Sequence, residues 1–162
     1  MEQDRLNSPG TAGKAHLMVV QAYLEQGPQI QKRIEALEYT RKMLYMRAIS
    51  PPSAAQQMGS KVQHSAPTEA SFCDSVAEAD EMAKTINKKQ DLLNSLHVQI
   101  IGVIIRSVTD EEARMLIAHF IEGKQWQEVA GEMHCSLRTL YRMKDAAVKK
   151  IVLPENPIWA KE

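Results

Sequence analysis

Apolar residues recur at heptad spacing in two stretches of this chain, and this pattern constrains the fold more than any other feature. The first stripe consists of Ile30, Ile34, Leu37, Leu44 and Ala48. The second consists of Ala79, Met82, Ile86, Leu93, Leu96, Ile100 and Val103. Arg41 and Lys89 occupy seam positions and fit their stripes poorly. Spacings of three and four residues place side chains on one face of an α-helix, so two long amphipathic helices are expected.

The two stripes can be covered in two ways. Within one chain they would form an antiparallel helical hairpin, and between chains they would form a coiled coil and hence a homo-oligomer. The stripes alone do not choose between these. Because aromatic residues make up only 5% of the chain, Leu, Ile, Val, Met and Ala must build the core. Methionines in the helical stretches, Met43 and Met46 among them, are expected to fill that core. The predicted fold class is all-α.

Local sequence signals divide the chain into six segments. Pro9, Gly10 and Gly13 indicate a disordered tail over residues 1–13. A break at Gly27-Pro28 is expected to interrupt the N-terminal helices. The remaining expected segments are N-terminal helices over 14–49, a flexible Ser- and Pro-rich linker over 50–75, a long helix over 76–107, a helical domain over 108–153 and a tail over 154–162.

Three helix starts carry recognisable capping signals. Ser75 with Glu78 and Thr109 with Glu112 both fit the capping-box pattern. A helix beginning at Thr109 should turn its apolar residues inward and stop at Gly123. Two shorter helices should follow, near residues 125–133 and 137–152, the second capped by Ser136.

The stretch from Trp126 to Ile151, WQEVAGEMHCSLRTLYRMKDAAVKKI, fits a helix-turn-helix. Two helices that cross closely need a small residue at the crossing, and Ala130 supplies it. The inward apolar positions of this motif are Val129, Met133, Cys135, Leu140 and Met143. Trp126 is expected to pack on the preceding helix.

The outer face of the second motif helix is suited to double-stranded DNA. The residues expected to contact DNA are Ser136, Arg138, Thr139, Tyr141, Arg142, Lys144, Lys149 and Lys150. Between His134 and Ile151 the only acidic residue is Asp145, although the whole chain has zero net charge. Such local asymmetry is typical of a helix that reads a DNA groove. Arg138, in the first turn, is expected to reach base edges.

The stretch EEARMLIAHFIEGKQWQEVAGEMHCSLRTLYRMKDAAVKKI, within this order of segments, resembles phage and prophage regulators of the ArpU/RinA type. Their C-terminal domain is similar to region 4 of bacterial sigma factors. The resemblance covers about Lys14 to Ile151 and depends mainly on residues 112–151. It implies control of late phage operons through promoter DNA, and contact with RNA polymerase.

Three positions depart from the family pattern. Gln125 stands where a Ser or Thr cap is usual before the tryptophan. His134 stands at a turn position that is often Gly, because left-handed backbone geometry suits glycine. His119-Phe120 replaces the usual Arg-Tyr pair. These changes leave the expected fold intact and the DNA target undefined.

Other chemistry finds little support in the sequence. No phosphate loop or recognisable nucleophile is present, so no enzyme activity and no cofactor are expected. His119 with His134 and Cys135 would make a poor tetrahedral metal site. No apolar run is long enough to span a membrane and no signal pattern opens the chain, so a cytoplasmic protein is expected. Two alternatives stay open: a DNA-packaging protein like a small terminase subunit, and a helical interaction protein with no DNA role.

Overall fold

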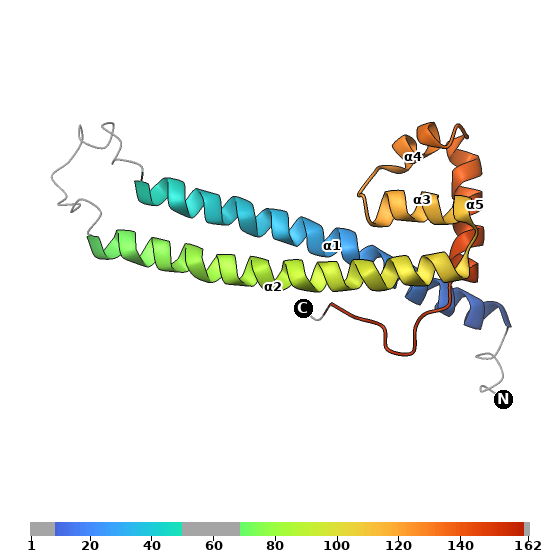
Figure 1. Cartoon of the computed structure of the whole chain (residues 1–162), viewed down its shortest axis with the longest axis horizontal. Helices are drawn as coiled ribbons and strands as arrows, with labels where there is room; N and C mark the ends of the chain where they lie inside the picture. The colour runs from blue at the N-terminus through green and yellow to red at the C-terminus, as the bar shows by residue number, and fades with distance from the viewer. Residues whose placement is uncertain (1–8, 50–68, 161–162) are drawn as a thin grey trace, which may run out of the picture. The chain divides into compact units, whose positions relative to one another are not determined.

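The computed structural model describes residues 9–49 and 69–160, and this part of the chain contains five α-helices and no strand (Figure 1). The helices are α1 (Pro9–Ile49), α2 (Glu69–Ser107), α3 (Asp110–Phe120), α4 (Trp126–Glu132) and α5 (Leu137–Lys150). The all-helical prediction is therefore confirmed. None of the described helices contains an apolar stretch that could cross a membrane.

The chain divides into two compact units. The helical-pair unit, Lys32–Asp91, is continuous in sequence. The composite unit combines Met1–Gln31 with Leu92–Glu162, so it contains the beginning of α1, the end of α2 and the three short helices. The expected domain over residues 108–153 is thus part of a larger unit that also includes residues from the first helix.

In the helical-pair unit, the end of α1 runs antiparallel to the beginning of α2 (Figure 1). Ile34, Ala79 and Ile86 are buried, as their heptad positions predict. The hydroxyl of Tyr45 donates a hydrogen bond to Asp80 across the pair, at 3.1 Å. Arg41, at the polar seam position, places its guanidinium carbon 5.6 Å from the centre of the Tyr45 ring. The hairpin alternative, with both stripes in one chain, therefore describes this unit.

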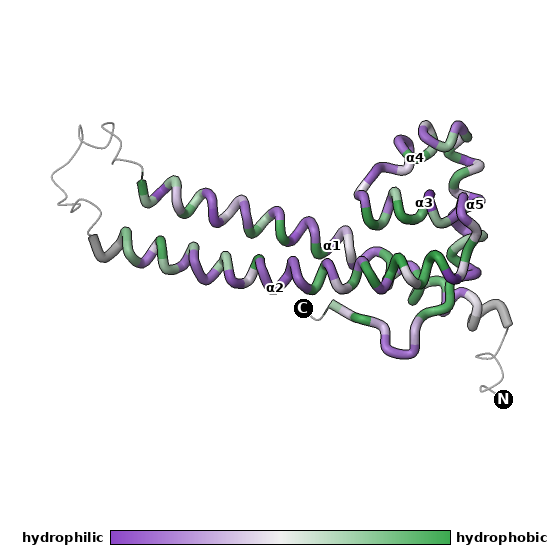
Figure 2. The backbone as a smooth tube through the Cα atoms, in the orientation of Figure 1, coloured by the Kyte–Doolittle hydropathy of each residue, from purple (hydrophilic) through white to green (hydrophobic). Residues whose placement is uncertain are grey.

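In the composite unit, the remaining parts of the same two helices form the main core. The fully or almost fully buried apolar residues of these two helices are Val20, Tyr23, Leu24, Ile30, Leu93, Leu96, Ile100, Val103 and Ile104. Figure 2 shows the concentration of apolar residues along this end of α2. The Tyr23 hydroxyl donates to Gln99 Oε1 at 2.7 Å, and burial raises the pKa of Tyr23 to about 12.

The helix break expected at Gly27-Pro28 does not occur, because α1 continues through Pro28. Proline in a helix interior removes one backbone hydrogen bond, a loss that packing on both sides can offset. Gly27 has a different role from the one expected. A Cβ atom there would lie 3.0 Å from His97 Nε2 and 3.3 Å from the Phe120 carbonyl oxygen. Glycine at this position permits the close approach of α2 and the end of α3.

Both long helices begin earlier than the sequence suggests. Helix α1 begins at Pro9, inside the expected tail, and residues 1–8 lie outside the described part. Helix α2 begins at Glu69, so residues 69–75 are helical and Ser75 is not its N-cap. The rest of the expected linker, residues 50–68, also lies outside the described part.

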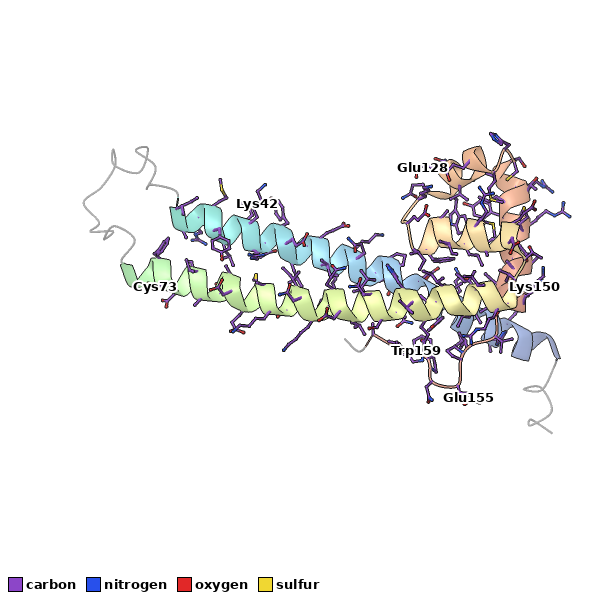
Figure 3. All side chains as sticks on the ribbon, in the orientation of Figure 1. Lys42, Cys73, Glu128, Lys150, Glu155 and Trp159 are labelled. Carbon is purple, nitrogen blue, oxygen red and sulfur yellow. The ribbon has the colours of Figure 1, made fainter. Side chains whose placement is uncertain are left out.

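The segment after α5 is ordered against the long helices through residue 160, where a tail was expected. Gln99 Oε1 accepts a hydrogen bond from the amide of Ile158 at 2.8 Å, and Gln26 Oε1 accepts from the amide of Ala160 at 2.7 Å. The ring of Trp159, which is labelled in Figure 3, meets the ring of Tyr23 edge to face, with centroids 5.8 Å apart. The two glutamines thus supply partners for backbone groups that have no helix of their own.

The methionine prediction holds only in part. Met115 is fully buried, whereas Met43 and Met46 are each 50% exposed and Met18 is 73% exposed. These three side chains lie on the outer faces of α1, away from the buried stripe. They therefore do not fill the core.

Candidate nucleic-acid interface

Helices α3, α4 and α5 pack together at a core made of Met115, Leu116, Val129, Ala130 and Leu140. All five are buried, with Leu140 fully so. Cys135, in the turn, and Met143 are half-buried at the edge of this core. Of the inward positions expected for the motif, Val129 and Leu140 are buried, whereas Met133, Cys135 and Met143 are half-buried.

The start of α3 is held as its capping box predicts. The backbone amide and the hydroxyl of Thr109 both donate to Glu112 Oε2, each at 3.1 Å. These bonds satisfy polar groups that a helix start leaves unpaired. Beyond the helix end, Gly123 adopts the left-handed region, with φ of 74°, and turns the chain towards α4.

Helix α4 is capped although the usual Ser or Thr is missing. Gln125 donates its backbone amide to Glu128 Oε2 at 2.8 Å, which is the reciprocal bond of a capping box. Trp126 then stacks on His119 of α3, with ring centroids 3.8 Å apart, and meets Phe120 edge to face. The expected packing of Trp126 on the preceding helix is confirmed. Gln125 and His119 thus both make contacts that hold the start of α4.

The turn between α4 and α5 contains the one described non-glycine residue with positive φ, His134 at 51°. This is the left-handed geometry expected at a position where glycine is common. Cys135 then donates its amide to the Ala130 carbonyl at 3.0 Å and closes the turn. Ser136 accepts a hydrogen bond from the Thr139 amide at 3.2 Å, so its role as N-cap of α5 is confirmed.

Six of the residues proposed to contact DNA are exposed on α5. They are Arg138, Thr139, Tyr141, Arg142, Lys149 and Lys150. No residue in the described ranges forms an ion pair with either of the two arginines or with Lys149. Ser136 is also exposed, although its hydroxyl oxygen already accepts the capping hydrogen bond from the Thr139 amide. The outer face of α5 therefore carries cations whose hydrogen-bond donors point to solvent.

Lys144 belongs to an aromatic cluster and is less accessible than expected. Its ammonium group lies 5.9 Å from the centre of the Trp126 ring and 5.6 Å from that of Tyr141. The ammonium is also 3.6 Å from Asp145, and the side chain is only 21% exposed. Such contacts stabilise a cation above aromatic rings. Lys144 thus contacts one ring from α4 and one ring from α5.

Lys150 is about half exposed, but its ammonium group is held in an ion pair within the protein. Its ammonium group donates to both carboxylate oxygens of Glu112, at 2.6 and 2.9 Å. Figure 3 labels Lys150 at the end of α5. The hydrogen bond from Lys150, together with those from Thr109, holds the pKa of the Glu112 carboxyl below its usual range against the opposing effect of burial. Lys150 therefore ties the end of α5 to the start of α3 instead of presenting a free charge to DNA.

The lowered pKa of Glu112 leads to a pH-dependent stability. The ion pair contributes stability above the unfolded carboxyl's pKa, near 4.5, and this contribution is lost as pH falls through the lower folded pKa. We expect Lys150→Met to cost about 1 kcal/mol of unfolding free energy at pH 7, because one partner is 46% exposed. The difference from wild type should disappear in acid.

Urea unfolding of the full chain between pH 3 and 7 measures this difference. Lys149→Met is the matched control, since Lys149 is the adjacent, exposed residue without an ion pair in the described structure. It should change stability little at any pH. Equal effects of the two substitutions would contradict the role assigned to the Lys150–Glu112 pair.

Sequence reasoning missed the part of α1 that supports this site. His16 Nε2 donates to the Ile151 carbonyl at 3.3 Å, just beyond α5. Gln21 and Glu25 line a small cavity of about 40 Å³ together with Trp126 and Lys144. The position of these residues in the first amphipathic helix gave only a general expectation of packing. Their actual neighbours are more than a hundred residues away in sequence.

Comparison with known protein families, with characterised proteins and with solved structures gives no match to this chain.

Proposed function

We propose that this protein is a sequence-specific DNA-binding regulator of transcription, in which α4, the turn at His134 and α5 act as a helix-turn-helix. In this proposal α5 enters the major groove, which is wide enough to admit one α-helix. Helix α4 lies across it and α3 supports both from behind.

The observation that carries the proposal is the composition of the exposed face of α5. Arg138, Thr139, Tyr141 and Arg142 are exposed within the first two turns, while Leu140 on the opposite side is fully buried. The first turns of a recognition helix are the part that reaches base edges. The buried side is committed to the core, so the polar side is available to a partner.

Charge supports nucleic acid as that partner. Five cationic residues lie between His134 and Ile151 against one acidic residue, in a chain of zero net charge. Two of these cations already have partners within the protein: Lys150 pairs with Glu112, and Lys144 lies in the aromatic cluster. The cations that are left for DNA are Arg138, Arg142 and Lys149. We assign base contact to Arg138, base or phosphate contact to Arg142, and phosphate contact to Lys149.

The resemblance to ArpU/RinA-type regulators extends the proposal to its biological setting. Control of phage or prophage genes, and contact with RNA polymerase, are the roles that this resemblance implies. They follow from the resemblance noted for residues 112–151 and not from any contact within the protein.

Selection of duplexes from a random pool by the full chain tests the proposal. A regulator should enrich a defined motif, and its affinity should fall as salt rises, with a logarithmic slope near one unit per phosphate contact. A scrambled duplex of equal length serves as the control. Absence of binding, or binding without enrichment of any motif, would refute the proposal; a large discrete ring would instead favour the packaging alternative.

A further inference from the structure

Two glutamine side chains of the composite unit, one from each long helix, hold the segment that follows α5. Gln99 of α2 donates from Nε2 to the Asn156 carbonyl at 3.0 Å and accepts at Oε1 from the Ile158 amide at 2.8 Å. Gln26 of α1 donates from Nε2 to the Ile158 carbonyl at 3.3 Å and accepts at Oε1 from the Ala160 amide at 2.7 Å. The two side chains are here called the glutamine site. Figure 1 shows the bound segment running back beside α2.

The four hydrogen bonds match the backbone of an extended peptide. In an extended chain the N–H and C=O groups of every second residue point to the same side. Residues 156, 158 and 160 therefore present their backbone groups to the glutamine site, and the amide of Trp159 takes no part in the four bonds. A carboxamide has a donor and an acceptor, as a peptide group does. Each glutamine thus binds one C=O and one N–H, in the manner of a neighbouring strand.

Contacts within the long helices hold the two glutamines in place. The Tyr23 hydroxyl donates to Gln99 Oε1 at 2.7 Å, and Gln26 Nε2 donates to the Tyr23 carbonyl at 3.1 Å. Gln26 is only 7% exposed. A buried carboxamide costs free energy unless its donor and acceptor are paired, and the Ala160 amide supplies the partner of Gln26 Oε1. The glutamine site is therefore built to bind an extended backbone.

The side chains of the bound segment are held less firmly than its backbone. Trp159 is 42% exposed, although its ring meets Tyr23 edge to face. Asn156 is exposed and Ile158 is half-buried. Where an extended peptide is bound in this way, backbone hydrogen bonds give affinity and contacts of alternate side chains give selectivity. Another segment can therefore take this place if it offers an apolar residue and then an aromatic residue at the positions of Ile158 and Trp159.

We propose that the glutamine site is a peptide-binding site for an extended segment of a partner protein, in which an apolar residue precedes an aromatic one. Residues 156–160 occupy the site in cis, and the partner segment displaces them. Because a short connection ties these residues to α5, their effective concentration at the site is high and the partner must compete with them. The proposal concerns α1 and α2 and does not depend on DNA binding.

Fluorescence anisotropy of a labelled peptide with the sequence of residues 153–160 tests the proposal on the full chain. The peptide should bind Trp159→Ala about tenfold more tightly than wild type, because loss of the ring weakens the segment in cis and leaves the site open more often. Glu155→Ala is the matched control, since Glu155 is exposed and precedes the hydrogen-bonded residues. It should bind the peptide as wild type does. Circular dichroism checks that each variant keeps its helix content.

Methylation of single backbone amides in the peptide tests the hydrogen bonds without altering the protein. Methylation at Ile158 or at Ala160 removes a donor that the glutamine site uses, so each should weaken binding to the Trp159→Ala chain about tenfold. Methylation at Trp159 is the control and should weaken binding clearly less.

Three results would overturn the proposal. They are the absence of binding to the Trp159→Ala chain, equal binding to this variant and to wild type, and equal losses from the three methylated peptides. Sedimentation equilibrium adds a check on the source of the segment. A concentration-dependent dimer of wild type that Trp159→Ala abolishes would assign the site to exchange between copies and would overturn a partner protein as the source.

Discussion

Replacing Leu140 with alanine should lower the unfolding free energy of the composite unit by about 2–5 kcal/mol. Leu140 is fully buried where α3, α4 and α5 meet, so truncation removes apolar contacts and leaves a cavity. Domains of this size are stable by only about 5–15 kcal/mol in total. The loss should therefore shift the urea midpoint strongly and lower the melting temperature.

Intrinsic fluorescence measures this effect selectively. The chain has two tryptophans, Trp126 and Trp159, and both belong to the composite unit. Leu137→Ala is the matched control, because Leu137 lies on the same helix but is only partly buried. It should cost clearly less than Leu140→Ala. Similar costs for the two substitutions would mean that Leu140 is not central to the packing of α5.

The second large effect concerns DNA. If α5 is a recognition helix, Arg138→Ala should weaken binding to the selected duplex by about 1–3 kcal/mol more than binding to a scrambled duplex. This corresponds to a loss of discrimination of roughly 5- to 150-fold. The physical reason is the loss of a bidentate contact to a guanine edge, which random DNA does not offer in register.

Lys149→Ala is the comparison, measured by salt titration on both duplexes. It should weaken both about equally and lower the salt slope by roughly one unit, since it removes a phosphate contact. Both side chains are exposed, so neither substitution should disturb the fold. If Arg138→Ala reduced affinity for both duplexes equally, α5 would be an electrostatic surface and not a reading helix.

The features that could be predicted from the sequence are those determined by interactions between residues close together in the chain. The buried stripe of α1 and α2 follows from heptad spacing. The Thr109–Glu112 box, the Ser136 cap and the left-handed residue at His134 each depend on a few neighbouring residues. Their geometry is decided locally, so a local pattern is sufficient.

The features that were missed depend on partners distant in sequence. Nothing near Gly27 reveals that His97 and Phe120 approach it, so the local sequence predicts a helix break there. Ser75 and Glu78 fit a capping box, but the helix already begins at Glu69. The local sequence predicts a DNA contact for Lys150, because its partner Glu112 lies 38 positions away and gives no local signal.

The discontinuous make-up of the composite unit has a consequence for how the chain folds as it is synthesised. The helical-pair unit is one continuous segment, so it can form before the C-terminal third has emerged. Val20, Tyr23 and Leu24, by contrast, are made early but are buried by residues from Leu92 onward. The side chain of Gln26 gains its hydrogen bond from the amide of Ala160 only after residue 160 has been made. A ribosome-bound nascent chain would therefore expose an apolar face of α1 until the residues from Leu92 onward have emerged, and aggregation or chaperone binding is favoured in that interval.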